Sequence, residues 1–178
     1  MGAKNLKLND GYGYGQLELN QCAFRRDGRI EAQCKIADGI EYLENGMILA
    51  INDENHTVEY PAAGAEMFGL NYTSEHMYDE RLVGGLKHFR LDKGTFLPRL
   101  GYLAVGDKFT TNTVVYDDSA DIATMKYGYV KAGDKGYIRL SATMPVDGIE
   151  GAPLLKVINA KATMPNGCPA VKFRCIKA

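Results

Sequence analysis

The sequence predicts an all-β, mainly antiparallel protein, made of two small β-barrel or sandwich-like modules with a long irregular connection and an extended N-terminal arm. Three observations lead to this prediction. A short strand–turn–strand unit recurs along the chain. The composition favours strands and turns, with 11 tyrosines, 20 glycines and no tryptophan. Prolines interrupt the C-terminal third, as expected for short strands joined by tight turns.

The recurring unit has the form Tyr-(Leu/Val)-x-x-Gly-Asp-Lys. It occurs at Tyr102–Phe109 and at Tyr129–Ile138, and a looser copy with Asn-Gly occupies Tyr42–Leu49. Glycine reaches positive φ angles without steric cost, so Gly-Asp and Asn-Gly mark tight turns. The apolar and β-branched residues on either side suit a half-buried, pleated strand. Each copy therefore predicts two β segments joined by a turn.

Length and charge limit the classes of partner. The chain has 178 residues, which suits one large or two small domains with a real core. The formal net charge is −1 and the basic residues are interleaved with acids, so the sequence predicts no nucleic-acid partner. No apolar run approaches the length of a membrane span, which predicts no membrane partner. We divide the chain into an arm (1–15), an N-terminal β module (16–61), a partly helical excursion (62–95) and a C-terminal β module (96–178).

The first module is predicted to begin with a hairpin over residues 17–36. Arg26–Arg29 contains Asp-Gly, the signal of a two-residue β-turn, and this turn places Ala23 opposite Ala32. In that register the apolar residues share one face: Leu17, Leu19, Ala23, Ile30, Ala32, Cys34 and Ile36. The turn and the apolar alternation agree, which is the strongest local argument in the sequence.

The middle of the chain changes character. Met47–Ile51 is apolar throughout, which predicts a strand buried on both faces, and Thr57–Tyr60 is predicted to return beside it. Residues 62–95 are interpreted as an irregular excursion, in which Ser74–Arg81 favours one or two helical turns. Long connections in compact proteins are commonly functional, so this one is a predicted contact surface.

The C-terminal module is predicted to consist of short strands. Their signals are alternating or β-branched runs bounded by glycine, proline or polar turns. The runs are 96–100, 110–116, 137–142, 154–158 and 171–176.

The sequence predicts no catalytic, cofactor-binding or metal-binding residue, and therefore no enzyme. Cys22 and Cys34 would point to opposite faces of the predicted hairpin, which excludes a disulfide or a shared metal there. The three histidines lack a matching Cys or His pair at ligand spacing. The acidic loop Asp117–Asp121 lacks the glycine and distal glutamate of an EF-hand loop, so an exposed turn is favoured over a calcium site.

Three parts of the sequence carry a resemblance to known proteins: the glycine-rich arm of residues 1–15, the segment Leu43–Leu49 and the segment Val105–Asn112. They resemble structural proteins of tailed-bacteriophage virions, especially capsid decoration or cement proteins. The resemblance implies a β-rich, non-enzymatic protein on the outer capsid surface, assembled in the host cytoplasm as a homo-oligomer such as a trimer. Its partner would be the major capsid protein, whose neighbouring subunits it would clamp against internal DNA pressure. The long middle excursion departs from the family pattern.

A clamp of this kind needs rigid modules and extended segments that fill grooves on a partner, and repetition on a lattice lets each contact be weak. The predicted contact residues are apolar and aromatic side chains of the arm and the excursion: Leu6, Leu8, Tyr12, Tyr14, Met67, Phe68, Tyr72, Met77 and Tyr78. Two alternatives remain open. One is another virion component, such as a tail-tube subunit or a head fibre, and the other is a β-barrel carbohydrate-binding or enzymatic domain with a deep polar pocket.

Overall fold

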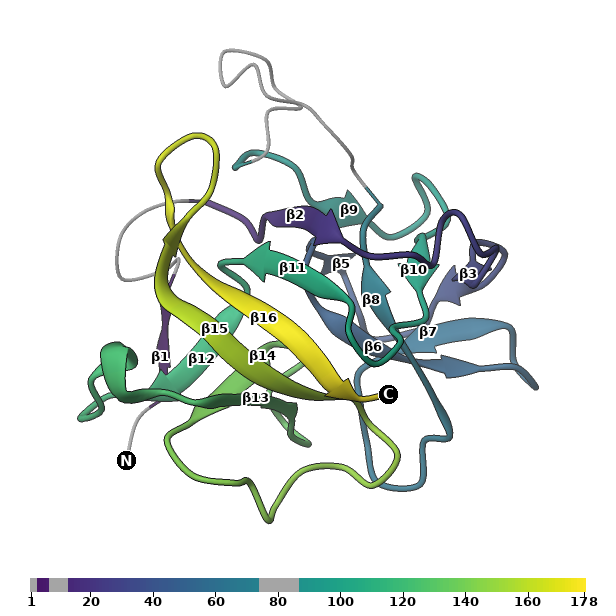
Figure 1. The fold of residues 1–178 in the computed structure, drawn as a ribbon. Helices are drawn as coiled ribbons and strands as arrows, with labels where there is room; N and C mark the ends of the chain where they lie inside the picture. Colours follow the sequence, from purple (N-terminus) through teal and green to yellow (C-terminus); the bar gives the residue numbers. More distant parts are fainter. Residues whose placement is uncertain (1–2, 7–12, 74–86) are drawn as a thin grey trace.

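The computed structural model describes residues 3–6, 13–73 and 87–178 (Figure 1). Eight strands of this part form one sheet. In spatial order they are β1 (Ala3–Asn5), β12 (Val114–Asp117), β14 (Ile138–Ser141), β13 (Tyr127–Val130), β15 (Leu154–Thr163), β16 (Pro169–Lys177), β11 (Lys108–Thr111) and β2 (Leu17–Gln21). Although β11 and β12 lie near opposite edges, only Asn112 and Thr113 separate them in the chain. So short a link requires the sheet to curl into a half-barrel.

Six further strands form a second sheet. In spatial order they are β3 (Ile30–Glu31), β10 (Leu100–Gly101), β8 (Met67–Asn71), β6 (Ile48–Asn52), β7 (Thr57–Glu59) and β4 (Lys35–Ile36). A small third sheet pairs β5 (Tyr42–Leu43) with β9 (Leu91–Asp92), and a short 3-10 helix, η1 (Ile122–Thr124), precedes β13. Within the described residues the pairs β12–β14 and β4–β7 are parallel and the others antiparallel. The predicted all-β, mainly antiparallel fold class is confirmed.

Strand β6 separates two hydrophobic cores. Ile48 and Ala50 belong to the larger core, whereas Leu49 and Ile51 belong to the smaller one. This division follows from the strand period, because successive side chains point to opposite faces. The prediction that Met47–Ile51 is buried on both faces is confirmed, and β7 returns antiparallel beside it as expected.

The predicted hairpin of residues 17–36 is wrong. Strand β2 pairs with β11 in the large sheet, whereas β3 pairs with β10 in the second sheet. The chain does turn where expected, at Gly28 with a φ angle of 70°. The strands part because Phe24 is fully buried and packs against Tyr72, with ring centroids 5.0 Å apart. Burial of the Phe24 ring draws the chain between the two sheets. The face assignments that were based on the hairpin register therefore no longer apply.

One of the three copies of the recurring unit closes a hairpin. The copy at Tyr129–Ile138 joins β13 to β14, which are antiparallel neighbours. The copy at Tyr102–Phe109 instead carries the chain from β10 in the second sheet to β11 in the large sheet. The copy at Tyr42–Leu49 carries it from β5 to β6. The central glycine of each copy has a positive φ angle, so the turns form as predicted while two of the three strand pairings do not.

The range 62–95 contains two strands that the sequence interpretation missed, β8 and β9. Met67–Asn71 is β8, which lies between β10 and β6 in the second sheet. The predicted helical turns of Ser74–Arg81 lie outside the described residues. Strands of the ranges 16–61 and 96–178 share both sheets, since β2 joins the large sheet and β10 the second. The predicted module boundaries therefore do not coincide with sheet boundaries.

Part of the predicted N-terminal arm belongs to the body of the protein. Ala3–Asn5 pairs antiparallel with β12 as an edge strand, and Leu6 is buried in the larger core. At the other end of the arm, the Tyr14 N–H donates a hydrogen bond of 2.9 Å to the carbonyl of Lys87. These contacts hold both ends of the arm's described portion against the sheets.

Candidate functional site

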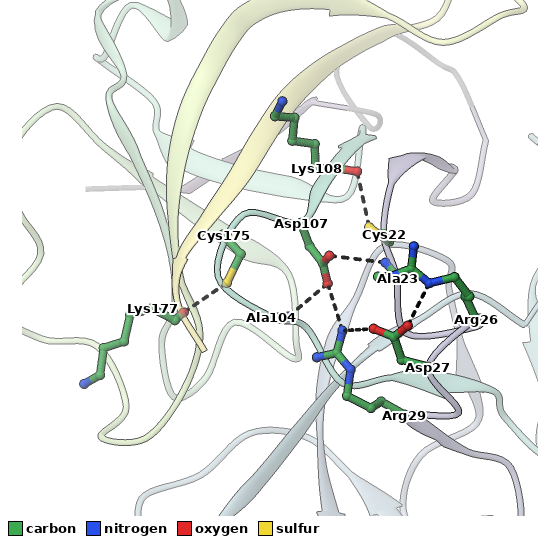
Figure 2. Close-up of polar contacts among 10 residues, drawn as sticks. All are labelled: Cys22, Ala23, Arg26, Asp27, Arg29, Ala104, Asp107, Lys108, Cys175 and Lys177. Atoms are coloured by element: carbon green, nitrogen blue, oxygen red, sulfur yellow. Dashed lines mark hydrogen bonds and ion pairs between the residues drawn. The ribbon is translucent and has the colours of Figure 1, made fainter.

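Asp107 lies at the turn that leads from the second sheet into β11 (Figure 2). Its side chain is buried, and both carboxylate oxygens accept backbone hydrogen bonds. Oδ2 accepts from the Ala104 N–H at 2.9 Å, and Oδ1 accepts from the Ala23 N–H at 3.2 Å. Its own backbone carbonyl accepts from the Cys175 N–H at 2.8 Å. One residue therefore joins the turn, the corner beside Phe24 and the end of β16.

Arg29 lies on one side of the Asp107 carboxylate and forms an ion pair with it. The guanidinium Nη2 lies 3.9 Å from Oδ2 of Asp107 and 3.6 Å from a carboxylate oxygen of Asp27. The Arg29 side chain is about a third exposed, so this contact is screened by solvent. The backbone donors are consequently the main partners of the Asp107 carboxylate.

Two thiols flank Asp107, and neither is suited to nucleophilic chemistry. Burial, with a further contribution from the charge of Asp107, raises the pKa of Cys22 to about 12 and that of Cys175 to about 11. Each thiol donates to a backbone carbonyl, that of Lys108 or that of Lys177. Because the nucleophile is the thiolate, both groups are inert near neutral pH. Strand β11 lies between their strands, which puts the two residues roughly 10 Å apart, beyond disulfide reach.

A second buried polar cluster surrounds Glu44, which is 1% exposed. Oε1 accepts a 2.6 Å hydrogen bond from the Tyr137 hydroxyl, and Oε2 accepts one from the Gly15 N–H. The backbone carbonyl of Glu44 accepts from the Asn71 side chain at 2.9 Å. Burial raises the pKa of Tyr137, which keeps its hydroxyl a donor. The cluster ties the turn of residues 44–47 to three other parts of the chain.

The same region continues through Gln16 and Asn112, both fully buried. The Gln16 N–H donates to Asn112 Oδ1 at 2.7 Å, and its carbonyl accepts from the Thr111 hydroxyl at 2.6 Å. Its side-chain oxygen accepts from Asn166 at 2.9 Å, which anchors the tip of the β15–β16 hairpin. These contacts hold loops in place, so we interpret this polar network as structural.

The structure places the predicted contact residues in three groups. Leu6, Phe68 and Tyr72 are core residues, at 7%, 7% and 2% exposure. Packing in the core explains their apolar character. Met67 and Tyr14 are half-buried. Tyr14 packs edge-on against Tyr42 and under the Arg90 guanidinium. The remaining four lie outside the described residues: Leu8, Tyr12, Met77 and Tyr78.

Sequence reasoning missed the large apolar side chains that project into solvent. They lie mainly on connections between strands, and they are Phe96 (71% exposed), Leu97 (44%), Val105 (69%), Met144 (54%), Val146 (98%) and Ile158 (47%). Phe96 and Leu97 border a hollow of about 310 Å³ whose lining includes Ile36. The available signal was an apolar residue beside a turn former, as in Val105-Gly106 and Pro145-Val146. That signal is weak, because single exposed apolar residues are common on protein surfaces.

Two aspartates of the acidic loop have protein partners. Asp121 accepts from the Ala123 N–H and caps η1, and Asp117 pairs with Arg139 at 3.1 Å. Among the residues that the structure describes, no group of three or more His, Cys, Asp and Glu side chains is arranged to hold a metal ion. Within the same part of the chain, no helix has the length and hydrophobicity needed to cross a bilayer.

Comparison with known proteins adds no relative: no family model, no curated protein and no solved structure matches this chain.

Proposed function

We propose that this chain is a non-enzymatic virion structural protein that decorates and stabilises a bacteriophage capsid by bridging major capsid protein subunits. The observation that carries the proposal is the turn around Val105. This side chain is 69% exposed, although it is large and apolar, and it opens the segment Val105–Asn112 that resembles capsid decoration proteins.

The turn that presents Val105 is held from three directions. Asp107 accepts from the N–H of Ala104, the Gly106 N–H donates to the Cys175 carbonyl at 2.9 Å, and the Cys175 N–H donates back to Asp107. A rigidly held apolar side chain loses little conformational entropy when a partner covers it. Such a turn suits a contact that is repeated on a lattice, where many weak contacts combine.

The buried polar groups support a structural role for the body. Both carboxylate oxygens of Asp107 and of Glu44 accept internal hydrogen bonds, and burial raises the pKa of the thiols of Cys22 and Cys175. These side chains join separate loops and strands. A stiff body with loops fixed in this way is what a protein needs to transmit force between capsid subunits.

The test is binding of the purified protein to heads assembled from the cognate major capsid protein, measured by co-sedimentation. Val105→Asp should reduce the bound amount by about tenfold or more, because a charge in a covered apolar contact is expensive. Ala132→Asp is the matched control, since Ala132 is exposed and occupies the same position in the hairpin copy of the unit. Wild-type protein that fails to bind heads would overturn the proposed function. Equal binding by the two variants would show that the Val105 turn is not part of the interface.

Isolated protein that polymerises into long tubes would instead favour a tail-tube subunit. A decoration protein should remain monomeric or form a small closed oligomer. Sedimentation velocity of the same preparation distinguishes these outcomes before heads are added.

A further inference from the structure

The outward face of the large sheet carries a row of cations. Strands β11, β16 and β15 are neighbours, and their register pairs Lys108 with Arg174 and Arg174 with Lys156. The adjacent residues Phe109 and Phe173 are paired and fully buried, so the three cations lie on the opposite, outer face. Neighbouring strands lie about 4.8 Å apart, which makes this row roughly 10 Å long. In Figure 2 the Lys108 side chain extends away from Asp107.

A fourth cation extends the row along β16. Lys172 lies two residues before Arg174, on the same face, between Thr110 of β11 and Asn159 of β15. The row ends at uncharged residues, Gln21 of β2 opposite Lys108 and Tyr127 of β13 opposite Lys156. The Lys156 ammonium lies 4.6 Å from the centre of the Tyr127 ring. We call Lys108, Lys156, Lys172 and Arg174 the cationic face.

No acidic side chain neutralises the cationic face. Within the part of the chain that the structure describes, none of its four members takes part in an ion pair. The acid nearest in register is Glu18 of β2, which lies opposite Thr110 and so diagonal to Lys108, and the Lys108 ammonium forms no ion pair with it. Like charges directly opposite each other on adjacent strands destabilise a sheet. The isolated chain therefore bears a cost that a negative partner would remove.

In the other half of the same sheet, Arg139 and the neighbouring Lys131 do have carboxylate partners. Arg139 of β14 pairs with Asp134 at 2.6 Å and with Asp117 at 3.1 Å, and Lys131 pairs with Asp147. The row on β11, β16 and β15 differs from these pairs, because four cations lie side by side there and, among the described residues, form no ion pair.

A complementary surface lies on the second sheet. The turn between β6 and β7 and the segment before β8 line a hollow of about 390 Å³. Asp53, Glu54, Glu59 and Glu66 contribute four carboxyl groups to its lining, which contains no lysine or arginine. We call this the acidic hollow. Figure 1 shows the β6–β7 turn projecting at the right-hand edge of the molecule, away from the β15–β16 hairpin.

We propose that the cationic face of one copy docks on the acidic hollow of a second copy. Four positive charges then meet four negative ones, in a chain whose net charge is −1. The two surfaces differ, so the contact is head-to-tail, and it closes into a ring when the rotation between copies divides a full turn. The cation row is the basis of the proposal, and the acidic hollow supplies the charge complementarity that selects a second copy as its occupant. This inference does not depend on the proposed capsid role.

The test is the sedimentation velocity of the full chain at low and high salt. Self-association should be present at about 20 mM NaCl and weakened about tenfold or more at 500 mM, because exposed charges are screened within a few ångströms at high salt. The variant Lys156→Glu/Arg174→Glu should sediment as a monomer at both salt concentrations. The control variant Lys35→Glu/Arg99→Glu makes the same charge change at exposed positions outside the cationic face. Its self-association should stay close to that of the wild type.

A charge-swap experiment identifies the partner surface. Glu54→Lys/Glu66→Lys should also be monomeric alone, and mixing it with Lys156→Glu/Arg174→Glu should restore a complex in which each surface meets its opposite charge. Glu59 is left unchanged because it accepts hydrogen bonds from Asn52 and Thr57. Circular dichroism of each variant, and recovery of association in the mixture, show that the chains are folded.

Three results would overturn the proposal. They are a wild-type monomer at every salt concentration, self-association that survives Lys156→Glu/Arg174→Glu, and a mixture of the swapped variants that stays monomeric. A monomer that binds a 20-nucleotide single-stranded DNA through Lys156 and Arg174 would instead assign the cationic face to a polyanion, contrary to the proposal.

Discussion

The turn at Val105–Lys108 and the turn at Ala132–Lys135 share the sequence Gly-Asp-Lys but have different roles. The first carries the chain from one sheet to another, and the second closes a hairpin. In the first, Asp107 accepts from the backbone of its own turn and from Ala23, far away in the sequence. In the second, Asp134 is held by two bonds from Arg139, in the strand that follows the turn.

The difference shows that a turn motif fixes local backbone shape but not the neighbours of the strands it joins. Each central glycine has a positive φ angle, which the motif requires. The partner of the aspartate differs because Phe24 is buried beside the first turn and brings Ala23 within reach of Asp107. At the second turn, Arg139 on the same hairpin donates to the carboxylate of Asp134.

The largest expected effect lies in the third copy of the unit. A Cβ atom at Gly46 would lie 2.1 Å from the Thr111 hydroxyl, in a backbone with φ of 85°. Gly46→Ala should therefore cost about 4 kcal/mol or prevent folding, from strain and overpacking together. At Gly106 and Gly133 the space is open, so alanine should cost about 1–2 kcal/mol from φ strain alone. Urea unfolding checks the order, and three equal costs would contradict it.

The next effect separates the two aspartates. Asp107→Ala leaves the N–H groups of Ala23 and Ala104 without their acceptor at a buried site, which should cost about 3 kcal/mol of unfolding free energy. Asp134→Ala should cost less, about 2 kcal/mol, because Arg139 keeps a second carboxylate partner, Asp117, at 3.1 Å. Arg29→Ala is the control for the charge of Asp107, and its cost should stay below about 1 kcal/mol. A larger loss for Arg29→Ala would show that the ion pair, and not the backbone bonds, holds Asp107.

Much of the fold followed from local pattern. The apolar run Met47–Ile51 became a strand that is buried on both faces, and the alternation around Ile138 became a strand whose burial alternates with the strand period. Strand β8 escaped notice because Met67–Asn71 contains a glycine and a terminal asparagine, both poor strand formers. Its glycine is required by packing, since a Cβ there would lie 2.7 Å from the Leu100 side chain.

The candidate sites could not be derived in the same way. The cationic face unites Lys108 with Lys156 and Arg174 through strand pairing, and no sequence spacing reveals that register. Asp107 has the same neighbours in sequence as Asp134, so its backbone contacts depend on where distant residues fold. Three of the predicted contact residues were buried because aromatic and apolar side chains serve a core and an interface equally well.

A pH series probes the thiols beside Asp107. The pKa of Cys22 is raised to about 12 and that of Cys175 to about 11, from an ordinary value of 9.0. The folded state therefore keeps thiol protons that the unfolded state releases above pH 9. The free energy of unfolding has its full value below pH 9 and falls as the pH rises toward 11 to 12. Between pH 8 and pH 10 the loss should reach about 2 kcal/mol. Urea unfolding should show a smaller loss for Cys22→Ala, and an unchanged loss would assign it to other groups, such as the tyrosines.

The smallest effect distinguishes the two aspartates by salt. Arg139 Nε and Nη2 lie 2.6 and 2.7 Å from the carboxylate of Asp134, and both side chains retain some exposure. Asp134→Asn should cost about 1 kcal/mol at low salt and slightly less in 1 M NaCl, because an attraction between two full charges that are 13–14% exposed is screened in part. The cost of Asp107→Asn should change little with salt, because its main partners are neutral backbone amides. Equal salt dependence of the two variants would mean that Arg29 contributes as much to Asp107 as Arg139 does to Asp134.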